Sequence, residues 1–386
     1  MRKTSFVALL FFLIGASLGY FVCQNKILTQ INEKFFQRDE RIVKIGAILP
    51  LSGDVASYGN NTKEGIDLAV EQINLSGGIN GKKIEIIYED SKADAKTGAS
   101  GMLKLIDIDK VQAIIDNSVS SVALAAVPIA DKNKVVLLST GSTNPKLSGI
   151  SPYFFRIWNS DALEGKVSAN FVVDSLNYKN ISIVYVNNEY GNGLAEVFKK
   201  QLLNKRGTVA AFETFEQNNT DFKNIISKLK ETSSDCIYLI AYPKEIAAFL
   251  KQRQELNLKK QIVGTVTMED KQIIEIAGNA ANGVIYPFPV NPSESDPTVS
   301  NFQNTFFKKY NKKPSITSDV GYDAVYLLSM AISNFNESGD GIRQGLKAIK
   351  GFHGASGVIE FDDFGDVSKS MKMKIIKDND FVLFTK

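Results

Sequence analysis

Residues 42–49, Ile-Val-Lys-Ile-Gly-Ala-Ile-Leu, form an apolar run that only Lys44 interrupts, and this run opens the pattern that decides the fold. Such a run is typical of a strand buried on both faces. The next apolar positions recur at the spacing of one helical face: Ile66, Ala69, Val70 and Ile73. A second strand is expected at 83–89, so the chain begins with a strand–helix–strand unit.

The alternation of strands and helices continues along the chain and restarts after about residue 160. Further strands are expected at 112–116, 135–139, 181–186, 209–215 and around Cys236, with helices between them. Two successive sets of such units predict an α/β protein of two lobes, each a doubly wound parallel sheet with helices on both faces. Ligands bind such sheets at the carboxyl ends of the strands, so a cleft between the lobes is expected.

The N-terminus has the form of an export signal. Arg2 and Lys3 precede residues 6–22, which carry no charge. A segment of this length is near the lower limit for crossing a bilayer, so residues 1–23 are either a cleaved signal peptide or a retained anchor. The polar residues 24–41 predict a linker. We therefore expect a periplasmic or other extracytoplasmic protein, with a membrane tether through residues 6–22 as the alternative.

Composition excludes several classes of function. The 45 basic and 42 acidic residues leave a net charge of +3, which is too small to favour non-specific nucleic-acid binding. His353 is the only histidine, so two-histidine zinc motifs are excluded and a catalytic triad is disfavoured. The two cysteines, Cys23 and Cys236, form no paired-cysteine metal motif.

Motifs for enzymatic chemistry are missing from the sequence. Gly339, Gly341 and Gly345 have the wrong spacing for a dinucleotide-binding loop and fall in an expected acidic loop. No phosphate-binding loop or nucleophile elbow occurs, and no nucleophile–base pair can be assembled for a hydrolase. The sequence predicts a protein that is not an enzyme and that uses no cofactor or metal.

Two hydroxyl-rich loops follow neighbouring strands. Residues 117–121, Asn-Ser-Val-Ser-Ser, lead directly into a helix, and residues 139–144, Ser-Thr-Gly-Ser-Thr-Asn, follow the next strand. Serine hydroxyls and the exposed N–H groups of a first helical turn favour a carboxylate. Simple helix capping and turn formation is the alternative, but the presence of two such loops side by side favours a binding site.

Several segments, in order and spacing, have the pattern of one protein family. They are Ile45–Gly53, Tyr58-Gly59, Gly65–Asn74, Gly77–Ile84, Glu89-Asp90, Tyr190–Gly193 and Tyr322–Val325. Together they resemble the bacterial ABC-transporter solute-binding proteins of the branched-chain amino-acid (leucine/isoleucine/valine-binding protein-like) family. The resemblance implies a type I periplasmic-binding-protein fold, whose lobes are joined by a multi-crossover hinge, close on a small solute and deliver it to an ABC permease.

The resemblance also implies domain bounds and site residues. Lobe 1 would comprise 42–160 plus about 289–366, and lobe 2 would comprise 161–288 plus about 367–386. Four residues would hold the ligand carboxylate: Ser120, Gly141, Ser142 and Thr143. Asp161 and carbonyl groups of the Gly141 loop would meet its ammonium group. The side-chain pocket would be lined by Tyr58, Tyr190 and Tyr242, and Trp158 would either wall this pocket or pack at the hinge.

The sequence departs from the family at two places. Val266 stands where amino-acid binders carry a second acid, and Glu269 follows three residues later. This change implies a shifted register, recognition by Asp161 alone, or a solute that is not an α-amino acid. The family's frequent disulfide is also missing, since Ala93 and Val119 occupy its positions.

These observations favour capture of a small apolar amino acid, with a branched-chain one first. The alternatives keep the same clamp and change its use. In one, the clamp binds an aromatic acid, an amide or urea. In the other, it acts as a tethered extracytoplasmic receptor.

Overall fold

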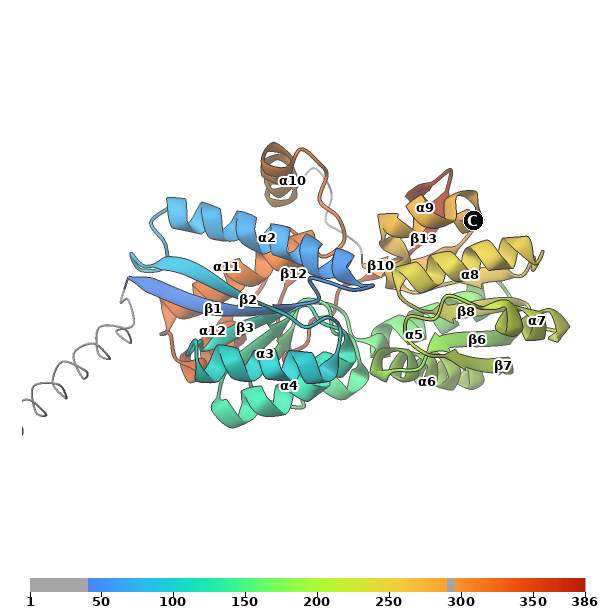
Figure 1. Cartoon of the computed structure of the whole chain (residues 1–386), viewed down its shortest axis with the longest axis horizontal. Coiled ribbons are helices and arrows are strands. Elements are labelled where there is room, and N and C mark those ends of the chain that lie inside the picture. The colour runs from blue at the N-terminus through green and yellow to red at the C-terminus, as the bar shows by residue number, and fades with distance from the viewer. Residues whose placement is uncertain (1–40, 290–295, 386) are drawn as a thin grey trace, which may run out of the picture. The chain divides into compact units, whose positions relative to one another are not determined.

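Two β-sheets form the centres of two lobes in the computed structural model, which describes residues 41–289 and 296–385 (Figure 1). Val43–Lys386 is one compact unit by its internal contacts, and the description concerns this unit. The first sheet has the order β2-β1-β3-β4-β5. Its strands are β1 (Ile42–Leu49), β2 (Lys83–Asp90), β3 (Ala113–Asp116), β4 (Val136–Ser139) and β5 (Phe154–Arg156). The pairs β1–β3, β3–β4 and β4–β5 are parallel, as the apolar runs predict.

Six helices accompany the first sheet in the described part of the chain. They are α2 (Ala56–Leu75), α3 (Ala95–Asp107), α4 (Ser120–Asn133), α10 (Pro297–Tyr310), α11 (Ser318–Asn334) and α12 (Gly339–Ala348). Helices α2 and α11 pack very closely, because a Cβ atom on Gly65 would lie 1.9 Å from the Ser318 carbonyl oxygen. This contact brings the start of α11 next to α2, although the two helices are far apart in sequence.

The second sheet has the order β14-β13-β10-β9-β8-β6-β7. Its strands are β6 (Asn180–Val186), β7 (Thr208–Phe215), β8 (Cys236–Ile240), β9 (Gln261–Val263), β10 (Ile285–Pro289), β13 (Met371–Lys377) and β14 (Asp380–Leu383). The strand pairs from β10 to β7 are parallel as predicted, and β13 and β14 extend the sheet at one edge, since β13 pairs antiparallel with both β10 and β14. Asp378 and Asn379 both have positive φ, and this backbone conformation makes the tight hairpin turn between β13 and β14.

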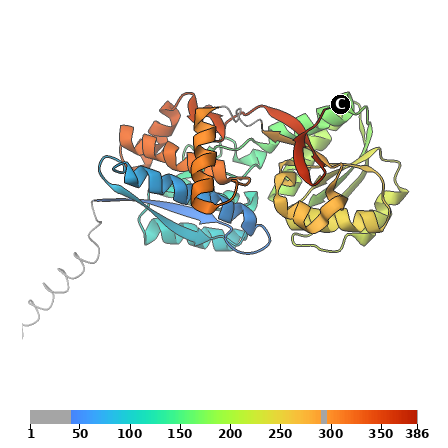
Figure 2. The same cartoon turned by 90° about the horizontal axis from the view of Figure 1, so that it is seen from above.

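The helices of the second lobe are α5 (Asp161–Asn170), α6 (Glu189–Asn204), α7 (Lys223–Glu231), α8 (Pro243–Glu255) and α9 (Lys271–Ala277). Short helical turns occur at Pro145–Leu147, Phe171–Ser175, Val266–Glu269 and Gly278–Ala281. The strands β11 (Phe352–Gly354) and β12 (Gly357–Ile359) form a separate hairpin. Figure 2 shows the two lobes from a second direction.

The glycine cluster near residue 340 is helical, so the expectation of an acidic loop there is wrong. Ser338 caps the start of α12 by accepting a hydrogen bond from the N–H of Gly341. A Cβ atom on Gly345 would lie 2.6 Å from the Cα of Ala331. The spacing of these glycines therefore reflects the packing of α12 against α11.

The chain passes between the two sheets after β5, after β10 and before β13. A buried ion pair joins the first and last of these passages. The Arg156 guanidinium donates to both carboxylate oxygens of Asp366, at 2.9 and 2.7 Å, and the Arg156 side chain is inaccessible to solvent. This two-point contact ties the end of β5 to the segment that leads into β13.

Between residues 41 and 289 and from 296 to 385, no helix combines the length and apolar character needed to cross a membrane. The predicted signal or anchor at 1–23 and almost all of the predicted linker at 24–41 lie outside the described residues.

Candidate functional site

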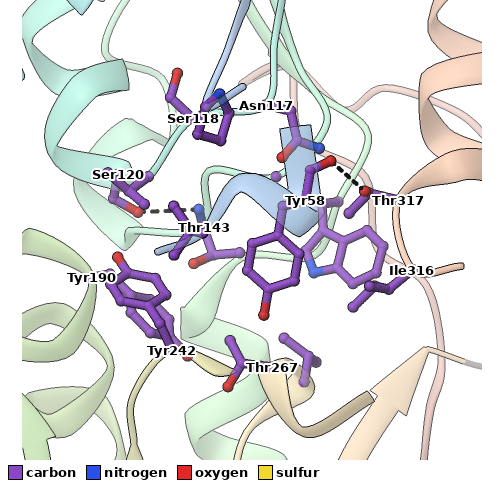
Figure 3. A pocket seen from close by; sticks show the side chains of 16 residues that line it. Tyr58, Asn117, Ser118, Ser120, Thr143, Tyr190, Tyr242, Thr267, Ile316 and Thr317 are labelled. Atoms are coloured by element: carbon purple, nitrogen blue, oxygen red, sulfur yellow. Dashed lines mark hydrogen bonds between the residues drawn. The ribbon is translucent and has the colours of Figure 1, made fainter. Parts of the chain in front are cut away.

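A cavity of about 580 Å³, including the space at its mouth, lies between the two lobes. Figure 3 shows the side chains that converge on it from both lobes. The lining residues are Pro50, Val55, Tyr58, Asn117, Ser118, Val119, Ser120, Gly141, Thr143, Trp158, Tyr190, Tyr242, Val266, Thr267, Ile316 and Thr317. Eight of the ten residues predicted from the sequence are among them, and Ser142 and Asp161 are not.

The start of α4 forms one wall of the cavity. The Ser120 Oγ accepts a hydrogen bond from the N–H of Thr143 at 3.3 Å (Figure 3) and another from the N–H of Asn144 at 3.2 Å. These contacts use the oxygen as an acceptor and leave the hydroxyl proton available to a ligand. The positive end of the α4 dipole lies at the same place. This wall is therefore suited to a carboxylate.

Asn117 joins the two hydroxyl-rich loops. Its amide nitrogen donates to Thr62 Oγ1 at 2.6 Å and to Thr140 Oγ1 at 2.8 Å. A Cβ atom on Gly141 would lie 2.9 Å from Asn117 Oδ1, so a side chain at position 141 would push the loops apart. Asn117 and Ser118 were not singled out as contacts from the sequence, although their place in the first loop was a signal for them.

Ser142 lies behind the cavity wall. Its hydroxyl is 2.8 Å from the Ser118 carbonyl oxygen and 3.1 Å from the Asp116 carboxylate, and the side chain is fully buried. Both partners belong to the neighbouring strand and its loop. Ser142 thus braces the two loops against each other in this structure.

Three tyrosines line the cavity: Tyr58 on α2, Tyr190 on α6 and Tyr242 at the N-cap of α8. The rings of Tyr190 and Tyr242 lie 5.5 Å apart, and the Tyr190 hydroxyl donates to Thr265 Oγ1 at 3.0 Å. The Tyr58 hydroxyl is buried and has no hydrogen-bond partner among the described residues. Figure 3 shows this hydroxyl directed into the cavity. A buried hydroxyl without a partner is costly, so its position favours a polar ligand group beside it.

Trp158 lines the cavity and also packs at a passage between the lobes. Its ring meets the ring of Phe288 on β10 edge to face, with the centroids 6.0 Å apart. The two roles considered for this residue are therefore compatible in one position.

Val266 contributes to the wall, and the acid that follows it does not. The Glu269 carboxylate forms an ion pair with Lys374 and accepts a hydrogen bond from the Tyr286 hydroxyl. Glu269 lies in a different cavity beside β10. Among the described residues that line the candidate site, none carries a charge.

Two buried acids on the first turn of α5 lie behind this neutral wall. Burial raises the pKa of Asp161 to about 7, and the nearby Thr143 hydroxyl and the Arg156 charge oppose this rise. Thr143 nevertheless makes no hydrogen bond of ordinary geometry to either carboxylate oxygen of Asp161. Burial and the charge of Asp161 raise the pKa of Glu164 well above its ordinary value, and the Val266 N–H, which donates to Glu164 at 3.0 Å, opposes this.

Ile316 and Thr317 complete the wall, and local sequence contains no signal for them. Thr317 has a φ of +73°, a left-handed conformation that a β-branched residue rarely adopts. Its hydroxyl donates to the Tyr58 carbonyl oxygen at 3.1 Å (Figure 3). Contact with α2 therefore holds this segment against the cavity.

Polar contacts join the two lobes around the cavity. The Ser57 hydroxyl donates to Asp270 at 2.8 Å, and Lys244 forms an ion pair with Asp54 at 2.6 Å. These contacts exist only while the lobes are close together, so the structure represents a closed arrangement. Within 41–289 and 296–385, no group of three His, Cys, Asp or Glu side chains is placed to hold a metal ion.

Comparison with known proteins gives matches along nearly the whole described chain. The periplasmic binding protein family matches residues 42–377. The leucine-, isoleucine-, valine-, threonine- and alanine-binding protein of Pseudomonas aeruginosa is 28% identical over 327 residues, covering 84% of this chain and 87% of the relative.

Solved structures show the same architecture. A leucine-binding protein from Thermotoga maritima has a TM-score of 0.84 and 29% identity, covering 89% of this chain and 98% of the other. A branched-chain amino acid transporter substrate-binding protein from Streptococcus pneumoniae, in complex with isoleucine, has a TM-score of 0.82 and 28% identity, with coverages of 88% and 97%. These structures confirm the predicted two-lobed α/β fold.

Proposed function

Because this chain belongs to the periplasmic binding protein family, as an ABC-transporter solute-binding protein, we propose that it captures a branched-chain amino acid between its lobes and delivers it to an ABC permease. The family binds solutes and is not enzymatic, and it places the protein outside the cytoplasm. The predicted family and the prediction that the protein is not an enzyme are thereby confirmed.

The carboxylate end of the cavity is the observation that carries this proposal. Ser120 lies at the first turn of α4 with its hydroxyl proton unused, and the Thr143 loop is hydrogen-bonded to it. Each charge-assisted hydrogen bond to a ligand carboxylate contributes about 1.5–3 kcal/mol. The unpartnered Tyr58 hydroxyl adds a further polar group that faces the ligand space.

The remaining wall suits an apolar side chain. It is made of aliphatic and aromatic groups: Val55, Val119, Trp158, Tyr190, Tyr242, Val266 and Ile316. Complete burial of a leucine or isoleucine side chain contributes about 1.5–3 kcal/mol. A cavity with hydroxyls at one end and apolar surface around it therefore matches a small amino acid with an apolar side chain.

Closure of the two lobes encloses the bound ligand between them. The ligand contacts loops of both lobes, so it stabilises the closed arrangement more than an open one. The ion pair between Lys244 and Asp54 adds to closure at the rim. Delivery then requires a permease that opens the clamp.

Calorimetric titration of the protein with the twenty common amino acids tests the proposal. We expect leucine, isoleucine or valine to bind most tightly, and Ser120→Ala to weaken binding about 10- to 100-fold through loss of one charge-assisted hydrogen bond. Ser121→Ala is the control, because Ser121 lies in the first turn of the same helix and does not line the cavity. Absence of binding by every amino acid would refute the proposed function.

The neutral wall favours one alternative ligand class. With Val266 in place of an acid, a solute that has a carboxylate or amide but no ammonium group also fits the described wall. The same titration, extended to benzoate, amides and urea, separates this class from amino acids. Intact mass of the exported protein decides between a cleaved signal and a tether through residues 6–22.

A further inference from the structure

An amino acid carries a protonated amine, and the described cavity wall offers no charged group to balance it. A buried ammonium needs both hydrogen-bond acceptors and a nearby negative charge. The balancing negative charge must therefore come from residues outside this wall.

Asp161 and Glu164 are the acids that stand directly behind this wall. They are three residues apart on α5, so their side chains project from the same face of the helix. The N–H of Asp161 donates to the Thr143 carbonyl oxygen at 2.9 Å, and Glu164 accepts from the N–H of Val266 at 3.0 Å. Thr143 and Val266 both line the cavity and come from opposite lobes. The acid pair thus lies where the two halves of the wall meet.

No cation in the described structure neutralises this pair. Both carboxylate oxygens of Asp161 lack a hydrogen-bond partner within residues 41–289 and 296–385, although the side chain is fully buried. The positive charge of Arg156 lowers the pKa of Asp161, but the Arg156 guanidinium is already paired with Asp366 through two hydrogen bonds. A buried, unpartnered carboxylate is costly and is retained where a ligand or reaction uses it.

Glu269 does not fill this role. Its charge is already balanced by Lys374, and it lines a different cavity. Glu164, in contrast, reaches the backbone of Val266, the position at which the resemblance leads one to expect an acid.

We propose that Glu164, held by the Val266 N–H, replaces the missing acid of the far lobe and, together with Asp161, supplies the negative charge that selects a ligand with a protonated amine. This inference rests on the proposed function and deepens it. In this arrangement the acids of α5, behind the wall, select the amine, and the residues of the wall bind the carboxylate and the side chain of the ligand.

Proton release accompanies binding if the pair has this role. Burial raises the pKa of both acids, and the charge of Asp161 raises that of Glu164 further, so the pair holds a proton in the ligand-free protein near neutral pH. The groups that face the pair are Arg156 on β5 and the tyrosines Tyr58, Tyr190, Tyr238 and Tyr242, whose own pKa values burial raises. An ammonium in the cavity favours the fully ionised pair, so up to about one proton is released per ligand bound.

The test compares leucine with isocaproate, which is leucine without its amino group, on the full-length protein. Glu164→Gln removes the charge and keeps an oxygen that accepts from Val266, so the fold is maintained. We expect this variant to bind leucine about 10- to 100-fold more weakly than the wild type and to bind isocaproate within about 3-fold of it. Glu269→Gln is the matched control, with affinity for both ligands unchanged. Adding Val266→Glu to Glu164→Gln should restore leucine binding.

Each outcome has a separate meaning. If the wild type binds no amino acid, the proposed function fails. If the wild type binds leucine and Glu164→Gln binds both ligands as the wild type does, or weakens both equally, the inference is overturned. Calorimetry of the wild type in buffers of different ionisation enthalpy does not depend on any variant. Proton release with leucine and none with isocaproate supports the inference, and no release with leucine overturns it.

Discussion

Replacing Asp161 by Asn should stabilise the ligand-free protein in a pH-dependent way. Burial raises the pKa of Asp161 from 3.8 to about 7, which is a rise of about 3 units. One pKa unit corresponds to about 1.36 kcal/mol, so the ionised side chain costs the folded state about 4 kcal/mol. The Asp161→Asn variant has no such titration at position 161, and it also lacks the charge that raises the pKa of Glu164, so about 4 kcal/mol is the contribution of Asp161 itself.

The unfolded chain loses the Asp161 proton at a lower pH than the folded chain does. Below pH 3.8 the folded and unfolded chains both hold it, so Asp161 has no pH-dependent effect on stability. Between about pH 4 and 7 the unfolded chain releases the proton while the folded chain keeps it, so wild-type stability falls as pH rises. Above pH 7 the loss is complete. The free energy of unfolding of Asp161→Asn, relative to that of the wild type, should therefore increase by about 4 kcal/mol between pH 4 and pH 8.

Urea unfolding followed by circular dichroism, at several pH values and without ligand, measures this difference. The buried amide of Asn also lacks partners and costs about 1–3 kcal/mol, but this term is the same at every pH. Glu196→Gln, on the exposed surface of α6, is the control and should shift stability little. A difference between Asp161→Asn and wild type that does not change with pH would refute the reasoning.

Three further substitutions test the fold and the closure. Arg156→Met leaves the carboxylate of Asp366 buried without its cation, and urea unfolding should show a loss of about 3–5 kcal/mol; an unchanged stability would contradict a structural role for the pair. Lys244→Met removes the rim ion pair to Asp54, so stopped-flow ligand dissociation should become about 2- to 5-fold faster at low salt and match the wild type at high salt. Gly65→Ala forces a Cβ atom against the α11 backbone, and thermal unfolding should show a loss of about 2–4 kcal/mol, whereas wild-type stability would mean that α2 and α11 separate easily.

Much of the fold follows from short-range sequence patterns. The apolar run at 42–49 coincides with β1, and the loops before and after residue 120 occur where the strand and helix periodicities change. The two hydroxyl-rich loops were predictable as a pair because both follow neighbouring parallel strands, which end at the same edge of the sheet, whereas Ser120 and Thr143 within them were named through the family resemblance. Ser142 shows the limit of this reasoning, since spacing places it in the loop without deciding which way its side chain points.

Local patterns determined the strands, the helices and the two hydroxyl-rich loops, because hydrophobic period and helix starts depend on residues close in sequence. Only the tertiary structure decided how the charges are distributed. Glu164 reaches the N–H of Val266, 102 positions away, whereas Glu269 is neutralised by Lys374, 105 positions away. Both acids lie close to Val266 along the chain or in space, yet among the described residues only Glu269 is paired with a cation, and Glu164 lies behind the cavity wall. That difference depends on which groups folding brings into contact, because electrostatic balance is set by distance in space and by burial.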